Sequence, residues 1–196
     1  MNPTREIRIA GFGGQGVILA GMVIGRAATL FDTQYVTLTQ SFGPEARGSA
    51  ASVQLIVSPS PVLYPYLTRL DILVAMSQEA YVRFVGDLEP NGLLIYEQDL
   101  VQTDDLRGDL RAYGIPGTRM AEALGRKLVL NMVMVGLLVG LTNLVKPEAL
   151  RQSIAVSVPT GTQTLNTVAF DKGFEYALAE AARLSSQEAG HMPAAE

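Results

Sequence analysis

The chain has 196 residues, of which 48% are hydrophobic and 17% are charged, and its formal net charge is -4. Soluble domains usually have about 25% charged residues, so the low fraction of charged residues predicts that the chain is buried against partner subunits. The net negative charge and the absence of a run of basic residues argue against nucleic-acid binding. The chain has no cysteine, and its one histidine, His191, lies in a polar tail, which excludes disulfides, a thiolate nucleophile, cysteine-ligated iron–sulfur clusters and a histidine-based triad or zinc site.

The first predicted unit is a strand, a glycine-rich turn and a helix. Residues 7–10 are apolar and predict a short strand, and residues 17–28 have helical spacing. Glycines let a backbone approach a ligand closely, and a helix N-terminus attracts anions. We therefore expect the turn to bind a phosphate group, with close packing of helix on strand as the alternative role of its glycines. The expected binding residues are Gly11, Gly13, Gly14, Gln15 and Gly16.

The spacing of Gly11, Gly13 and Gly16 also fits the dinucleotide-binding fingerprint. That fingerprint needs an acidic residue at the end of the second strand to bind the ribose hydroxyls. The second predicted strand, residues 34–40, is followed by Ser41, and Asp32 precedes it. The missing acid argues against NAD or FAD as a ligand.

Residues 41–49 contain two glycines and a proline and predict a shaped loop. The loop follows the carboxyl end of the second strand, at the sheet edge where ligands bind in open α/β proteins. We expect Ser41 and Arg47 to contact a ligand or a neighbouring chain. A surface ion pair between Arg47 and Glu45 is the equally weighted alternative.

Strands and helices then alternate, which predicts an α/β fold with a doubly wound, mostly parallel, Rossmann-like sheet and additional C-terminal helices. Further strands are expected at 51–57, 71–75, 93–96 and 110–115, and helices at 79–85, 118–123, 128–144, 147–156 and 165–184. A rigid connector is expected around Tyr64-Pro65-Tyr66. We expect one domain over residues 1–184 and a disordered tail over residues 185–196.

Residues 128–145 form the longest apolar run, which we interpret as a buried helix and not as a membrane span. Asn131 within it must find a hydrogen-bond partner, as a cap, at a subunit interface or on a ligand. The N-terminal residues do not resemble a signal peptide, so we expect a cytoplasmic protein.

Four segments together resemble the gamma subunit of 2-oxoacid:ferredoxin oxidoreductases over about residues 5–184. These segments are residues 9–17 (IAGFGGQGV), 40–48 (QSFGPEARG), 71–80 (DILVAMSQEA) and Asn131-Met132. Residues 40–48 are most similar to the 2-oxoglutarate enzyme, and indolepyruvate oxidoreductases have a related subunit. Phe42, Ala46 and Ser49 depart from the commoner tyrosine, methionine and glycine.

The resemblance implies an enzyme that decarboxylates a 2-oxoacid on thiamine diphosphate and Mg²⁺ in its alpha and beta subunits. Iron–sulfur clusters on a ferredoxin-like or cluster-bearing subunit would carry the electrons to ferredoxin, and coenzyme A would receive the acyl group. The gamma subunit would have no catalytic residues and no metal, but would cover the active site and help bind coenzyme A. The alternatives are a nicotinamide-dependent dehydrogenase, a free-standing nucleotide- or coenzyme A-binding module, or the pyruvate, branched-chain or indolepyruvate form of this enzyme.

Overall fold

The structure, a computed structural model, describes residues 3–42 and 50–189, with side chains up to residue 183. The strands are β1 (Arg5–Phe12), β2 (Tyr35–Phe42), β3 (Ala50–Ser58), β4 (Leu70–Ala75), β5 (Leu88–Glu97) and β6 (Arg111–Ile115). The α-helices are α1 (Val17–Arg26), α2 (Gln78–Phe84), α3 (Gly117–Ala123), α4 (Leu130–Thr142), α5 (Pro147–Ser157) and α6 (Gln163–Ala189). Single turns of other helix types are η1 (Ala27–Phe31), η2 (Val85–Asp87) and η3 (Lys127–Val129). α6 therefore extends beyond the predicted end at residue 184, while residues 190–196 lie outside the described residues.

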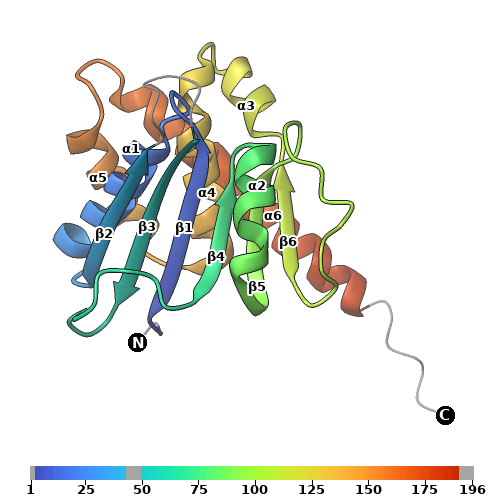
Figure 1. Cartoon of the computed structure of the whole chain (residues 1–196). Coiled ribbons are helices and arrows are strands. Elements are labelled where there is room, and N and C mark those ends of the chain that lie inside the picture. The colour runs from blue at the N-terminus through green and yellow to red at the C-terminus, as the bar shows by residue number, and fades with distance from the viewer. Residues whose placement is uncertain (1–2, 43–49, 190–196) are drawn as a thin grey trace.

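The strands form one sheet in the order β2-β3-β1-β4-β5-β6 (Figure 1). Neighbours from β1 to β6 pair in parallel, whereas β3 is antiparallel to both β1 and β2. The doubly wound α/β prediction is confirmed, but the reversed direction of β3 was not predicted. The physical reason is the short connection between β2 and β3, because parallel neighbours need a long crossover while antiparallel neighbours can be joined directly.

Two hydrophobic cores lie on opposite faces of the sheet. The larger core joins the sheet to α1, α4, α5 and α6, and the smaller one lies between the sheet and α2 (Figure 1). Strand β4 is buried on both faces, since Ile72 and Val74 belong to the larger core and Leu73 and Ala75 to the smaller. This two-sided burial explains its continuous apolar sequence.

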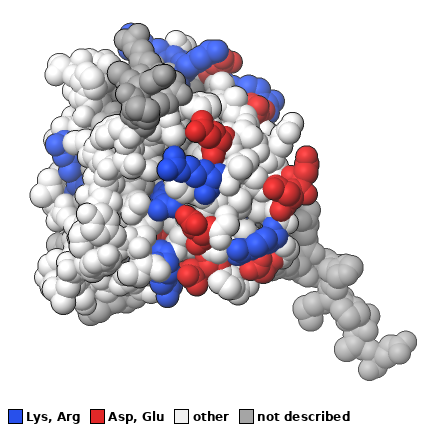
Figure 2. All heavy atoms as spheres, in the orientation of Figure 1, with Lys and Arg blue, Asp and Glu red and all other residues white. Residues whose placement is uncertain are grey.

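One margin of the sheet is uncharged. β2 lies at the end of the strand order, and residues 35–42 include no charged residue and no proline. Figure 2 shows that the part of the surface over β2 and β3 is mostly without charged side chains, which gather toward the middle and right of the view. Natural proteins usually protect such an edge with charges, prolines or a covering element.

Helices α4 and α6 approach each other through glycines. A Cβ atom added at Gly136 would overlap the carbonyl oxygen of Phe170, and one at Gly173 would overlap that of Val133. α4 is buried along nearly its whole length, as the apolar run predicted. Within the described residues, no helix is both long and apolar enough to cross a membrane.

The Asp32 carboxylate joins the end of η1 to the connection between α4 and α5. It accepts hydrogen bonds from the Lys146 N–H at 3.0 Å and the Gln34 amide at 3.2 Å, and pairs with the Lys146 ammonium at 2.9 Å. Burial by itself raises the pKa of Asp32, but the hydrogen bonds from Lys146 and Gln34 outweigh burial and lower that pKa below its ordinary value of 3.8.

A carboxyl group whose pKa is lower in the folded chain stabilises the fold above its ordinary pKa and loses that effect as the pH falls through the folded-state pKa. We therefore expect Asp32→Asn to lower the free energy of unfolding by about 1 kcal/mol at neutral pH. The difference should shrink as the pH falls below about 4. Urea unfolding of both proteins across this pH range measures it, and a difference that does not vary with pH would contradict the assignment.

Candidate functional site

The glycine turn joins the carboxyl end of β1 to the start of α1. Gly14 has φ +102° and Gly16 has φ +74°, values that side-chain-bearing residues rarely adopt. Gly16 is the residue immediately before α1, so the turn ends where the unpaired N–H groups of the helix begin. The predicted strand, turn and helix are therefore present in this order.

Gln15 is turned into the protein. Its side-chain oxygen accepts a hydrogen bond from the Phe12 N–H at 2.7 Å, and its side-chain nitrogen donates to the Met76 carbonyl at 2.8 Å. Its own N–H donates to the Phe12 carbonyl at 3.1 Å. Gln15 thus holds the turn against the end of β4, and its polar groups are already paired.

Asn131 fixes the other side of the turn. Its side-chain nitrogen donates to the Gly16 carbonyl at 3.1 Å, and its side-chain oxygen accepts from the Met132 N–H at 2.9 Å. The side chain is almost fully buried, and a Cβ atom at Gly16 would overlap it. Asn131, left open between three roles by the sequence, therefore joins α4 to the glycine turn.

The glycines divide into two groups by their surroundings. A Cβ atom at Gly11 would overlap the Gln15 side chain and come within 3.0 Å of Met76, so Gly11 and Gly16 are required by packing. A Cβ atom at Gly14 would meet nothing within 4 Å. Gly14 is exposed and Gly13 is half-buried, which leaves this part of the turn open to a ligand.

A cavity of about 240 Å³ lies beside the turn, on the face of the sheet that carries α2. Ser41 lies opposite Ser52 in the β2–β3 pairing, and Ser52 lies opposite Ala10 of β1, so one row of residues crosses three strands at the cavity. Gly11, which was predicted to lie in the turn, belongs to β1 and lines the cavity just before the turn begins, which makes the two features continuous. The structure therefore brings predicted residues from β1 and β2 to one place, while Arg47 and Glu45 lie outside the described residues.

α2 contributes residues that were not predicted for the site: Glu79, Arg83 and Phe84, with Ser77 just before the helix. The Arg83 guanidinium lies 5.1 Å from the centre of the Phe84 ring. The Ser77 oxygen accepts from the Ala80 N–H at 3.2 Å and so caps the helix. The only signal in the sequence was the position of Ser77 after the buried strand 71–75.

Open amides at Gly13 and Gly14, the N-terminus of α1, serine hydroxyls and the Arg83 guanidinium together suit an anionic ligand with an uncharged portion. Amides and the helix end would contact the anion, and the cavity would hold the neutral part.

Comparison with known proteins supplies a second line of evidence. A family model described as pyruvate ferredoxin/flavodoxin oxidoreductase matches residues 6–176. The 2-oxoglutarate synthase subunit KorC of Methanocaldococcus jannaschii is 45% identical over 175 residues, which cover 88% of this chain and 94% of that protein.

Two solved structures are also similar. The gamma subunit of keto/oxoacid ferredoxin oxidoreductase from Geobacter sulfurreducens has 37% identity and a TM-score of 0.78, over 89% of this chain and 99% of that chain. The 2-oxoglutarate:ferredoxin oxidoreductase of Magnetococcus marinus, solved with 2-oxoglutarate, coenzyme A and succinyl-CoA bound, has 26% identity and a TM-score of 0.83. The match covers 91% of this chain and 32% of that longer chain.

Proposed function

Because the chain belongs to the pyruvate ferredoxin/flavodoxin oxidoreductase family, we propose that it is the gamma subunit of a 2-oxoglutarate:ferredoxin oxidoreductase. The complete enzyme would convert 2-oxoglutarate, coenzyme A and oxidised ferredoxin into succinyl-CoA, CO₂ and reduced ferredoxin. The observation that carries this proposal is the 45% identity to a 2-oxoglutarate synthase subunit over nearly the full length of both proteins. Residues 1–184 would form one gamma-type domain, acting in the cytoplasm.

The donor set of this chain does not fit an iron–sulfur cluster, because clusters are held by cysteine thiolates and the chain has no cysteine. The clusters, and the thiamine diphosphate with its Mg²⁺, would therefore belong to the alpha, beta and cluster-bearing subunits. This chain would contribute binding and shielding of the active site.

Purification of the tagged chain from its own host tests the subunit assignment. We expect thiamine-binding and cluster-binding chains to elute with it, together with coenzyme A-dependent reduction of an artificial electron acceptor by 2-oxoglutarate. If the complex is active only with pyruvate or only with a branched-chain oxoacid, that oxoacid replaces 2-oxoglutarate as the proposed substrate. A chain that elutes alone and without activity would reject the subunit role in favour of a free-standing coenzyme A- or nucleotide-binding module.

We also propose that the glycine turn receives a phosphate group of coenzyme A. The amides of Gly13 and Gly14 would contact the phosphate, while Gly11, Gln15 and Gly16 hold the turn in shape. Ser41 would contact the ligand from the adjacent cavity. Arg47 remains part of this proposal as a source of charge-assisted hydrogen bonds.

Gly14→Asp should raise the Michaelis constant of the complex for coenzyme A at least about ten-fold, because it places a negative charge beside the phosphate and so weakens contacts worth about 1.5–3 kcal/mol. The turnover number at saturating coenzyme A should change little. Steady-state kinetics of the complete complex with varied coenzyme A measures both quantities.

Two controls separate the charge from backbone strain. Gly14→Ala places an uncharged side chain at the same φ of +102°, and Gly108→Asp places the charge where a Cβ atom also meets nothing within 4 Å. Gly108 precedes β6, at the opposite end of the parallel strands from the glycine turn. A Michaelis constant of Gly14→Asp equal to that of either control would contradict a phosphate site at the glycine turn.

A further inference from the structure

The connection between β3 and β4 holds large apolar side chains out in water. Within residues 59–67, called here the exposed loop, Leu63 is 95% exposed, Tyr64 58% and Tyr66 56%. The two tyrosine rings lie edge to face with centroids 5.7 Å apart. The exposed loop has three prolines and no charged residue. Leu67 packs against the smaller core, but Leu63 and the two tyrosines contribute little to the core of their own chain.

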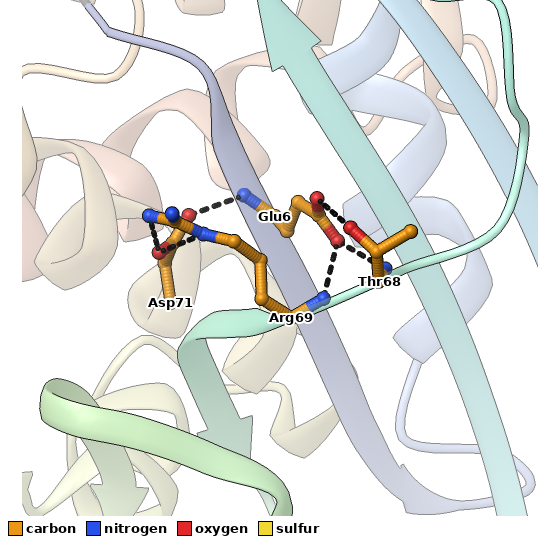
Figure 3. Close-up of polar contacts among 4 residues, drawn as sticks. All are labelled: Glu6, Thr68, Arg69 and Asp71. Carbon is orange, nitrogen blue, oxygen red and sulfur yellow. Dashed lines mark hydrogen bonds and ion pairs between the residues drawn. The ribbon is translucent and has the colours of Figure 1, made fainter.

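The far end of this loop is held by a buried carboxylate (Figure 3). The Glu6 side chain accepts hydrogen bonds from the Thr68 N–H at 2.6 Å, the Thr68 hydroxyl at 2.9 Å and the Arg69 N–H at 3.0 Å. Asp71 in turn accepts from the Glu6 N–H at 2.9 Å and pairs with the Arg69 guanidinium at 2.6 Å. With the second bond of that pair, from the Arg69 Nε at 3.1 Å, six hydrogen bonds among Glu6, Thr68, Arg69 and Asp71 fix where the exposed loop returns to the sheet.

The near end is also tied down. The Ser58 hydroxyl lies 2.9 Å from that of Thr4 and accepts from the Ser60 N–H at 3.1 Å. Proline restricts the chain between these anchors. A loop held at both ends has already lost conformational entropy on folding, so it would lose little more on binding to a partner. Tyrosine is enriched among the residues that anchor protein–protein interfaces, and this loop displays two tyrosines beside Leu63.

The exposed loop adjoins an uncharged face of the sheet. Val36, Leu38 and Leu55 of β2 and β3 pack against the helices. Because side chains alternate along a strand, the residues between them face the other side. Those of them that are exposed or half-buried, called here the neutral face, are Tyr35, Thr37, Thr39 and Gln54. Glu6 alternates with Ile7 and so anchors the loop on this same side of the sheet. Arg8, which lies opposite Gln54, is where the charged part of this side begins, on β1.

We propose that the exposed loop and the neutral face form the surface on which this chain docks to a thiamine-binding catalytic subunit, with Leu63 and Tyr66 entering an uncharged, apolar pocket of that subunit. The choice of partner rests on the proposed function. If the pocket of the partner contained a charged side chain, that charge would lose its water on docking and would find no opposite charge on the exposed loop or the neutral face. The receiving pocket must therefore be uncharged.

A second copy of this chain is the less suitable partner. Four cavities in the described part of the chain are lined with charged side chains, among them Arg83 beside α2, Lys146 near η1, Arg183 on α6 and Arg69 before β4. These charges favour a different chain as the one that carries the receiving pocket.

The test uses the chain co-expressed with the catalytic subunits of its own organism. We expect Leu63→Asp to weaken binding to the catalytic subunits at least about 30-fold, as for the loss of a central anchor. Leu63 is almost fully exposed, so the melting temperature of the variant should match that of the wild type. Leu178→Asp, on the exposed side of α6 with 51% exposure, is the matched control and should bind normally.

Three other outcomes have distinct meanings. Normal binding of Leu63→Asp would overturn the docking surface and leave the gamma-subunit assignment intact. A wild-type chain that binds no catalytic subunit would reject the proposed function itself, and the docking surface with it. A wild-type dimer that Leu63→Asp converts to a monomer, with binding to the catalytic subunits unchanged, would overturn the proposal in favour of contact between two copies.

Discussion

Gly136→Val is expected to lower the free energy of unfolding by about 3 kcal/mol or more, because its side chain would have to occupy space filled by the backbone of α6. The added Cβ alone would overlap the Phe170 carbonyl oxygen and come within 2.7 Å of the Phe174 nitrogen. Neither atom belongs to a side chain that can turn aside, so the two helices must separate. A change of this size is a large share of the roughly 5–15 kcal/mol that stabilises a typical domain.

Chemical denaturation followed by circular dichroism measures this difference. Gly86→Val provides the control, because a Cβ atom at Gly86 meets nothing within 4 Å and the site is exposed. We expect the control to stay within about 0.5 kcal/mol of the wild type. If both variants unfold at the same denaturant concentration, α4 and α6 do not pack as closely as described.

Asn131→Leu should have the second largest effect, a loss of about 2–4 kcal/mol in the free energy of unfolding. The substitution removes both hydrogen bonds of a side chain that is 1% exposed and leaves the buried Met132 N–H without its partner. It also releases Gly16 from α4. The glycine turn should therefore lose its fixed shape, and the Michaelis constant of the complete complex for coenzyme A should rise as well.

Asn166→Leu separates these two effects. The Asn166 side chain is also buried, at 7% exposure, but it donates only to the Thr162 carbonyl four residues before it. This control should lose stability without any change in the Michaelis constant for coenzyme A. A similar kinetic change in both variants would mean that general destabilisation, and not the shape of the turn, governs coenzyme A binding.

The sequence predicted most strands and helices because their apolar periodicities are local. It did not predict the direction of β3, since Ala51 to Val57 reads as a strand in either orientation. The glycine turn was placed correctly, yet the contacts that hold it lie far away in the chain. Gln15 reaches Met76, and Asn131 reaches back 115 residues to Gly16. No local pattern reports such pairings.

In the candidate site, too, the sequence predicted residues marked by a local pattern and missed those brought there by long-range packing. Ser41 was predicted as the first residue of a loop after a strand, whereas the structure places it inside β2, where it lines the cavity. Arg83 was missed because it lies on the face of a short helix, where a lone arginine has the appearance of a solvated surface residue. The connector around Tyr64 was predicted to be rigid, but the role of Glu6 in holding it depends on contact between residues 62 and 63 positions apart.

The uncharged edge strand β2 affects how the protein behaves in the cell when its partner subunits are scarce. Eight residues without charge or proline are a template for pairing with any other unpaired strand. Copies made in excess of their partners would therefore be prone to aggregate and would become substrates for chaperones and proteases. Synthesis of the subunits in equal amounts would prevent this aggregation. Light scattering of the chain alone measures it, and Thr39→Lys, which puts a charge on β2, should reduce it.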